Sequence, residues 1–208
     1  MNDTWQSYFI DGTDVLKNKL GITNTKELEE KEKLISLEKL TYLKLFPING
    51  CFDANHLKRI HKFLFDDIYY FAGEYRTCTL AKTTREFYKP EEIEKYLNDE
   101  LERMNKDGKL INSLDYYSFF LADMYYQLMT VHPFREGNGR TVREFLREYV
   151  LENNKNLPFD VELDFSRMDK DEFLKAVEHH YIYPSLLHML FKDALVEKNV
   201  SKSDIKKI

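Results

Sequence analysis

Glycine and proline are scarce in this chain of 208 residues, which has 7 of the first and 5 of the second. All-β folds need many turn residues, so this scarcity favours a helical protein. Cysteine is also rare. Cys51 and Cys78 are too few for a disulfide framework, and neither lies in a metal-binding or redox spacing. We therefore expect free thiols, a reducing compartment and a cytoplasmic protein.

Long apolar runs and excess positive charge are missing as well. No stretch is long enough to span a bilayer, and the acidic N-terminus MNDTWQSYFIDG has no signal-peptide core. The formal net charge is -5, whereas general nucleic-acid binders need clustered Lys and Arg to neutralise phosphates. We expect no membrane partner and no direct nucleic-acid binding, so that any phosphate site must be local.

Internal repeats and linkers are not visible, and the sequence predicts one domain over residues 1–208. A helical segment occupies residues 1–50, with Thr25 as N-cap and a helix that ends before Pro47. Its predicted apolar stripe is Leu28, Leu34, Ile35, Leu37 and Leu40.

Hydrophobic periodicity predicts further helices along the chain. The stretch NHLKRIHKFLFDDIYYFAG reads as a helix that Gly73 terminates, and another begins at Pro90. Between them, about residues 74–90, Thr and aromatic residues predict a β-hairpin turning near Thr83 and Thr84. Later helices are expected over DYYSFFLADMYYQLMTV, from Asn138 or Gly139, over 172–180 with Asp169 as cap, and over 184–195. The helix after Asn138 has a predicted buried stripe of Val142, Phe145, Leu146, Tyr149 and Val150.

The loop 132–143, HPFREGNGRTVR, concentrates reactive and positively charged residues. Arg140 and Arg143 lie with Arg147 on the helix face opposite the buried stripe, and two of them are near its N-terminus. That end of a helix carries partial positive charge and disfavours arginine. A bound polyanion is the simplest compensation for this arrangement.

Neighbouring residues of the loop fit the same chemistry. Gly137, Asn138 and Gly139 can turn backbone N–H groups toward phosphate. Glu136 beside such a cradle is a candidate ligand for Mg²⁺, and His132 is a candidate general base near neutral pH. Together these residue types indicate phosphoryl or nucleotidyl transfer. The other histidine pairs, His56 with His61 and His179 with His180, lack a metal spacing and are expected to be core or surface residues.

The loop resembles the signature of the Fic family (filamentation induced by cyclic AMP), HPFx(D/E)GNGRxxR, at every fixed position. A second stretch, IHKFLFDDIYYFAGEYR, is similar to the family's IHxxLFxDIYxWAGxxR, with Phe71 where Trp is usual. FIDGTDVLKNKLGI resembles the N-terminal segment of bacterial Fic toxins. The resemblance covers roughly residues 8 to 195.

The resemblance implies an all-α Fic-fold helical bundle with a short β-hairpin flap, and a protein adenylyltransferase that moves AMP from ATP to a Ser, Thr or Tyr hydroxyl of a target protein. His132 would accept the hydroxyl proton and Glu136 would coordinate Mg²⁺. Gly137, Asn138 and Gly139 would hold phosphates, with Arg140 on the β-phosphate and Arg143 on the γ-phosphate.

Other roles follow from the same resemblance. Phe134 would be the structural anchor of the motif, and the flap would dock the target as an added strand. Lys82 and Phe87 are the candidate flap residues, with simple hairpin packing as the alternative. Related branches phosphorylate their targets but carry Lys at the position of Gly139. Transfer of UMP or phosphocholine, and a non-catalytic partner-binding module, stay as alternatives.

Regulation is the last implication. Many Fic proteins carry an inhibitory helix with (S/T)xxxE(G/N), whose Glu pairs with the second motif arginine, here Arg143. Thr25 to Glu29 fits (S/T)xxxE, but Glu30 follows where Gly or Asn is expected. We favour a toxin that a separate small antitoxin inhibits, with self-inhibition through Thr25 and Glu29 as the alternative. DNA gyrase and topoisomerase IV are first trial targets, since the sequence does not reveal the target.

Overall fold

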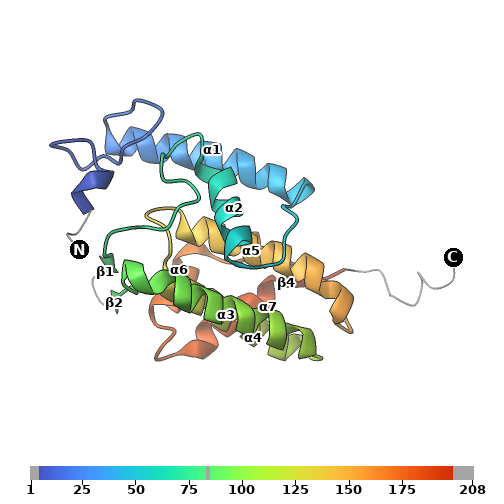
Figure 1. The fold of residues 1–208 in the computed structure, drawn as a ribbon. Coiled ribbons are helices and arrows are strands. Elements are labelled where there is room, and N and C mark those ends of the chain that lie inside the picture. The colour runs from blue at the N-terminus through green and yellow to red at the C-terminus, as the bar shows by residue number, and fades with distance from the viewer. Residues whose placement is uncertain (1–4, 83–84, 199–208) are drawn as a thin grey trace. The chain divides into compact units, whose positions relative to one another are not determined.

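A computed structural model of the chain describes residues 5–82 and 85–198 and is mostly helical, which confirms the predicted all-α class with a small antiparallel hairpin (Figure 1). The described residues form two compact units. The first holds the residues up to Asp99 together with Met129–Glu144, and the second holds Glu100–Leu128 and the residues from Phe145 onward. Among the described residues, no helix combines the length and apolar character needed to cross a membrane.

The helix α1 (Thr25–Leu45) has Asn24 as its N-cap, with the Asn24 side chain accepting a hydrogen bond from the N–H of Glu27 at 3.0 Å. The prediction of Thr25 as cap is wrong, because Thr25 is the first helical residue and its hydroxyl donates to Asp14 at 3.2 Å. Asn and Thr are both good caps, so neighbouring candidates are hard to separate by sequence. The helix ends before Pro47, as predicted.

The buried face of α1 differs from the predicted apolar stripe. Leu34 and Leu37 are 61% and 57% exposed. The residues that α1 buries are Leu28, Glu32, Ser36 and Leu43. Two polar side chains therefore point into the first unit, where α1 packs against α2 (Figure 1).

The helix α2 (Ala54–Phe65) starts at the N-cap Asp53, whose side chain accepts from the N–H of His56 at 2.8 Å. It ends earlier than predicted. Gly73 is not its terminator, because residues 66–73 fold into turns and Gly73 closes them with a φ of 83°. The buried residues of this stretch include Leu57, Ile60, Leu64 and Ile68.

The predicted hairpin is present but short. The strands β1 (Ala81–Lys82) and β2 (Arg85–Glu86) pair antiparallel, with Ala81 opposite Glu86. We call residues 78–88, which include this hairpin, the flap. The turn predicted at Thr83 and Thr84 lies outside the described residues.

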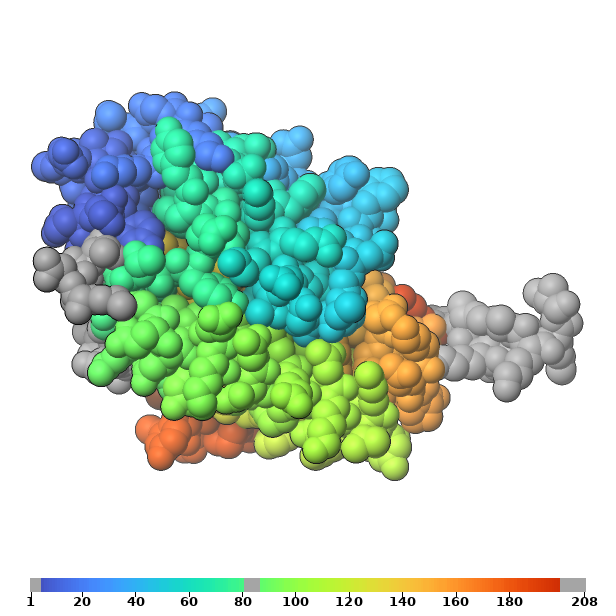
Figure 2. Space-filling model, in the orientation of Figure 1, coloured from blue at the N-terminus to red at the C-terminus, as the bar shows by residue number. Residues whose placement is uncertain are grey.

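The N-terminal residues lie directly against the turns that follow α2, as Figure 2 shows in blue and blue-green. Lys19 forms an ion pair with Asp66 at 2.9 Å, and the hydroxyl of Tyr8 accepts from the N–H of Thr77 at 2.9 Å. This segment begins with the 3-10 helix η1 (Trp5–Tyr8). It therefore supports the stretch that leads into the flap.

Three further helices are α3 (Ile93–Asp107), α4 (Leu114–Val131) and α5 (Asn138–Asn153). α5 begins where it was predicted. Its predicted stripe is confirmed, since the following residues are all 2% exposed or less: Val142, Phe145, Leu146, Tyr149 and Val150. Short 3-10 helices stand beside these elements at Pro90–Glu92, Gly108–Leu110 and Asn154–Asn156.

The second unit also contains α6 (Lys170–Glu178) and α7 (Pro184–Ala194), with a 3-10 helix at Phe165–Arg167. Asp169 caps α6 as predicted, accepting from two backbone N–H groups at 3.0 Å. Two strands were not predicted. β3 (Val161–Leu163) pairs antiparallel with β4 (Leu195–Glu197), which takes over where the last helix was expected to end.

Candidate functional site

The predicted motif, residues 132–143, occupies the loop between α4 and α5 and the first residues of α5, and all twelve of its residues belong to the first unit. His132 follows the last residue of α4 with a φ of 48°, in the left-handed region that non-glycine residues rarely adopt. Such a conformation persists only where its surroundings hold it. Neighbouring residues must therefore maintain the backbone conformation of His132.

Met129 and Phe87 both contact the imidazole of His132. Its Nδ1 lies 3.3 Å from the carbonyl oxygen of Met129, which can only accept, so Nδ1 carries the proton in this bond. In the neutral ring, Nε2 then holds the lone pair that a general base needs. The Phe87 ring stacks on the imidazole, with centroids 4.0 Å apart and an angle of 19° between the planes. The structure thus brings the flap residue Phe87 to the predicted base.

Glu136 offers one carboxylate at the start of α5. Its side chain is 44% exposed, and Oε1 accepts from the N–H of Gly137 at 2.9 Å. Among the described residues, no group of three or more His, Cys, Asp or Glu side chains could hold a metal on its own. Mg²⁺ bound to nucleotides commonly takes one or two carboxylates and completes its shell with phosphate and water. The donor set here fits that mode of binding.

The turn into α5 requires glycine at position 137. Gly137 has a φ of 79°, and a Cβ there would lie 2.3 Å from a ring carbon of Phe65. The chain can therefore pass over this ring only without a side chain. The first N–H groups of α5 have no acceptor inside the helix, and they carry its partial positive charge. This end of the helix can accept an anion.

The side chain of Asn138 bonds within the motif loop. Its Oδ1 accepts from the N–H of Phe134 at 2.9 Å and its Nδ2 donates to the carbonyl of Phe134 at 2.7 Å. The residue is 3% exposed. Asn138 therefore closes the loop onto itself, and only its backbone N–H is left for an anion.

Arg140 is anchored from α1. Its guanidinium forms an ion pair with Glu32 and donates to the hydroxyl of Ser36 at 3.0 Å. It also lies over the Phe65 ring, 4.8 Å from the centroid. The other carboxylate oxygen of Glu32 accepts from the hydroxyl of Tyr69, whose pKa is raised by burial and by this neighbouring negative charge. These contacts hold the guanidinium in one place while 22% of the side chain stays exposed.

Arg143 lies further along α5 and is half-buried. Within the described part of the chain, it has no ion pair with Glu29, which is exposed on α1. Thr25 is engaged with Asp14 instead. The structure therefore does not bring the predicted self-inhibition residues Thr25 and Glu29 to the motif. The contact between α1 and a motif arginine is made by Glu32 and Arg140.

Phe134 is fully buried and stacks on the imidazole of His61, with centroids 3.8 Å apart and planes at 12°. His61 Nδ1 accepts from the N–H of Gly73 at 2.8 Å, and its Nε2 donates to the carbonyl of Glu136 at 3.0 Å. Burial, with a smaller contribution from the charge of Arg140, lowers the pKa of His61 to about 4. The neutral ring therefore joins the motif loop to the turns after α2.

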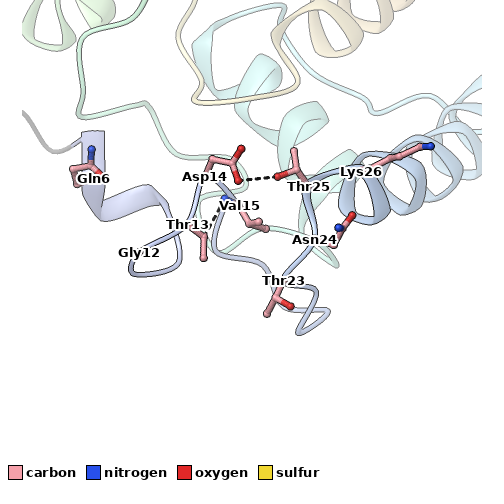
Figure 3. A pocket seen from close by; sticks show the side chains of 9 residues that line it. All are labelled: Gln6, Gly12, Thr13, Asp14, Val15, Thr23, Asn24, Thr25 and Lys26. Carbon is pink, nitrogen blue, oxygen red and sulfur yellow. Dashed lines mark hydrogen bonds between the residues drawn. The ribbon is translucent and has the colours of Figure 1, made fainter.

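Lys82 lies in β1 opposite Arg85, and its side chain is outside what the structure describes. A hollow of about 760 Å³ elsewhere in the first unit is lined by the N-terminal segment and the start of α1 (Figure 3). Asp14 and Thr25 line it and are bonded to each other. No residue of the motif reaches this hollow. We place the candidate site at the motif loop.

Sequence reasoning missed three supporting residues, Glu32, His61 and Arg76. His61 and Arg76 lie in the second stretch that resembles the family pattern, and their place at fixed positions of that pattern was the available signal. Glu32 shares a helix face with Leu28 at a spacing of four. A charged residue on a buried stripe is such a signal too.

Comparison with known proteins gives one family. The model of the Fic/DOC family matches residues 51–150. The protein adenylyltransferase VbhT of Bartonella schoenbuchensis is 33% identical over 193 residues, which cover 91% of this chain and 39% of that protein. The chain thus spans about two fifths of the length of this relative. The probable protein adenylyltransferase y4lH of Sinorhizobium fredii is 31% identical over 175 residues, covering 80% of this chain and 83% of that protein.

Solved structures give the same fold. The N-terminal Fic domain of a VirB-translocated Bep effector from Bartonella quintana superposes with a TM-score of 0.80 at 26% identity, covering 97% of this chain and 96% of that one. BepC of Bartonella tribocorum, solved with AMPPNP bound, gives a TM-score of 0.81 at 25% identity, covering 93% and 98%.

Proposed function

Since the chain belongs to the Fic/DOC family, we propose that it is a protein adenylyltransferase, which transfers AMP from ATP to a Ser, Thr or Tyr hydroxyl of a target protein. The orientation of His132 carries this proposal, because Nδ1 lies 3.3 Å from the carbonyl oxygen of Met129, and in the neutral ring this bond puts the basic lone pair on Nε2. Two relatives named protein adenylyltransferase and the AMPPNP bound to BepC support it.

In the proposed transfer of AMP, each polar group of the loop has a role. Nε2 of His132 takes the proton from the target hydroxyl, and the oxygen forms a bond to the α-phosphorus of ATP. The bond from that phosphorus to the bridging oxygen of the β-phosphate breaks, and pyrophosphate leaves. Arg140 on the β-phosphate, Arg143 on the γ-phosphate and the N–H groups at Gly137, Asn138 and Gly139 bind the negative charge.

Mg²⁺ is the cofactor that the site fits. Glu136 would hold the ion, which would supply positive charge that stabilises the departing pyrophosphate. The partly exposed carboxylate of Glu136, two residues before the start of α5, supports this assignment. Phe134 is a buried residue of the same loop, and it would hold Glu136 and the phosphate-binding backbone in position.

The flap is the proposed docking edge for the target. An extended target segment would pair with the hairpin as an added strand, which selects the hydroxyl by its position along the backbone. Lys82 in β1 and Phe87 beyond β2 would contact the segment or the nucleotide. The stacking of Phe87 on His132 supports this role, because it places one end of the flap at the base.

For regulation we favour inhibition in trans, by a small antitoxin that presents a carboxylate to Arg143. The chain would then act in the cytoplasm as the toxin of a toxin–antitoxin pair. Support comes from Arg143, which is half-buried and has no ion pair with Glu29 within the described residues. DNA gyrase and topoisomerase IV are first trial targets, and UMP or phosphocholine transfer is the alternative reaction.

Labelled ATP tests the reaction. The protein is incubated with Mg²⁺, a cell lysate and ATP labelled either at the α- or at the γ-phosphate. Transfer of the α-label alone is expected, and it should vanish in His132→Ala and persist in the control His179→Ala, an exposed histidine on the second unit. Transfer of the γ-label would indicate phosphorylation. A partner-binding module would transfer neither label.

A further inference from the structure

Arg76 is buried to 1% exposure, although it carries a charge that is costly to remove from water. Its guanidinium donates to four backbone carbonyl oxygens. Nε donates to His132 at 2.7 Å, one terminal nitrogen donates to Cys78 at 2.8 Å, and the other donates to Tyr88 and, at 3.3 Å, to Val131. Within the described residues Arg76 has no carboxylate partner, so these carbonyls are what compensates its charge.

One side of this cluster is the end of α4. Val131 is the last helical residue and His132 follows it. Their carbonyl groups lie at the C-terminal end of α4, where carbonyls receive no hydrogen bond from within the helix and carry its partial negative charge. The backbone N–H of Arg76 donates to Pro133 at 2.9 Å. A single residue therefore binds three successive peptide groups around His132, whose φ of 48° has to be held by its surroundings.

The other side of the cluster is the flap. Cys78 precedes β1 and Tyr88 follows β2, so the guanidinium bonds to both ends of the hairpin. It is planar and rigid, and the positions of its donors relative to one another are fixed. Phe87, the neighbour of Tyr88, is the residue that stacks on the imidazole of His132.

We propose that Arg76 is a positioning residue that fixes the flap and the His132 imidazole relative to each other, so that a hydroxyl docked on the flap meets Nε2. This inference rests on the proposed AMP transfer, and it adds Arg76 to the residues on which that reaction depends. Arg76 acts through carbonyl groups and does not contact Arg140 or Glu136. Its loss should therefore lower the rate of transfer and leave the affinity for ATP intact.

Arg76→Lys tests this with the charge retained. A lysine places its three donors on one atom, which cannot bridge the carbonyls of His132 and Tyr88 as the guanidinium does. The rate of α-label transfer from ATP into lysate proteins is measured per ATP-binding site, and the Kd for ATP is measured by calorimetry. We expect a rate about 10- to 100-fold lower, the usual cost of misplacing a catalytic group by about 1 Å, with an unchanged Kd.

The matched control is Arg103→Lys, the same substitution at a partly exposed arginine of α3 paired with Glu100 and Asp123. It should change neither the rate nor the Kd. Phe87→Ala supplies the second variant, and the two substitutions at Arg76 and Phe87 should be less than additive, since both act on one flap geometry.

Arg76→Lys with the wild-type rate per ATP-binding site would overturn the proposal. If that variant binds no ATP because it does not fold, Phe87→Ala decides. A loss of rate with an intact Kd supports the positioning of His132 through the flap, and an unchanged rate overturns it. A wild-type protein without any transfer is a different result, because it refutes AMP transfer itself and the positioning role with it.

Discussion

His61 should make the first unit less stable as the pH falls. Its folded-state pKa is about 4 against an ordinary value of 6.5, chiefly because the ring is buried and neutral. In the unfolded chain it is protonated below about pH 6.5. The contribution of His61 to the free energy of unfolding is therefore fully present above pH 6.5, and it is lost as the pH falls from 6.5 toward 4. From this pKa difference we expect a loss of about 2 kcal/mol at pH 5, approaching about 3 kcal/mol at the acid limit.

His61→Asn isolates this contribution. An asparagine can still accept from the N–H of Gly73, but it does not titrate. The variant should be less stable at pH 7.5, because it loses the stacking on Phe134. Its further loss between pH 7.5 and pH 5 should be smaller than that of the wild type by about 2 kcal/mol.

Urea unfolding followed by the fluorescence of Trp5 is a suitable assay. Trp5 is the single tryptophan of the chain, and it lies 4.3 Å from the Arg135 guanidinium in the unit that contains His61. His179→Asn, at an exposed position of the second unit, should keep the wild-type dependence. An equal loss of stability with falling pH in His61→Asn and in the wild type would refute the reasoning.

Two further substitutions test the loop and its support. Glu32→Ala should raise the Kd for ATP about tenfold, as measured by calorimetry, because Arg140 loses the charged partner that holds it. Glu38→Ala, at an exposed position of the same helix, is the control. Tighter binding of ATP by Glu32→Ala would instead mean that Glu32 is inhibitory. Gly137→Ala should lower the free energy of unfolding by about 1–3 kcal/mol and reduce AMP transfer, since its φ is 79° and the new Cβ meets the Phe65 ring. Wild-type stability and wild-type AMP transfer in Gly137→Ala would contradict the conclusion that this turn requires glycine.

Periodicity predicted those elements whose sequence pattern agrees with their burial. α5 has its apolar residues at helical spacing, and every residue of its predicted stripe is buried. α1 differs because leucines also occur on its outer face, at Leu34 and Leu37, while Glu32 and Ser36 point inward to Arg140. The inward position of these polar residues depends on a partner more than a hundred residues away, which local sequence does not reveal.

Short strands were equally hard to predict. β3 and β4 have three residues each and pair across more than thirty intervening residues, so neither shows a useful alternation of its own. The residue types of the loop and the family resemblance identified the motif, but not the use of its side chains. Asn138 illustrates this, because its amide closes the loop onto Phe134.

The central claim is that Nε2 of His132 activates a hydroxyl for attack on the α-phosphorus of ATP. Mass spectrometry of proteins modified by the wild type and by His132→Ala, with pyrophosphate release measured in parallel, tests it most directly. We predict an AMP adduct on a Ser, Thr or Tyr hydroxyl and one pyrophosphate per adduct, both lost in His132→Ala although ATP still binds. The same adduct formed by His132→Ala at the wild-type rate, or a phosphate adduct in place of AMP, would contradict it.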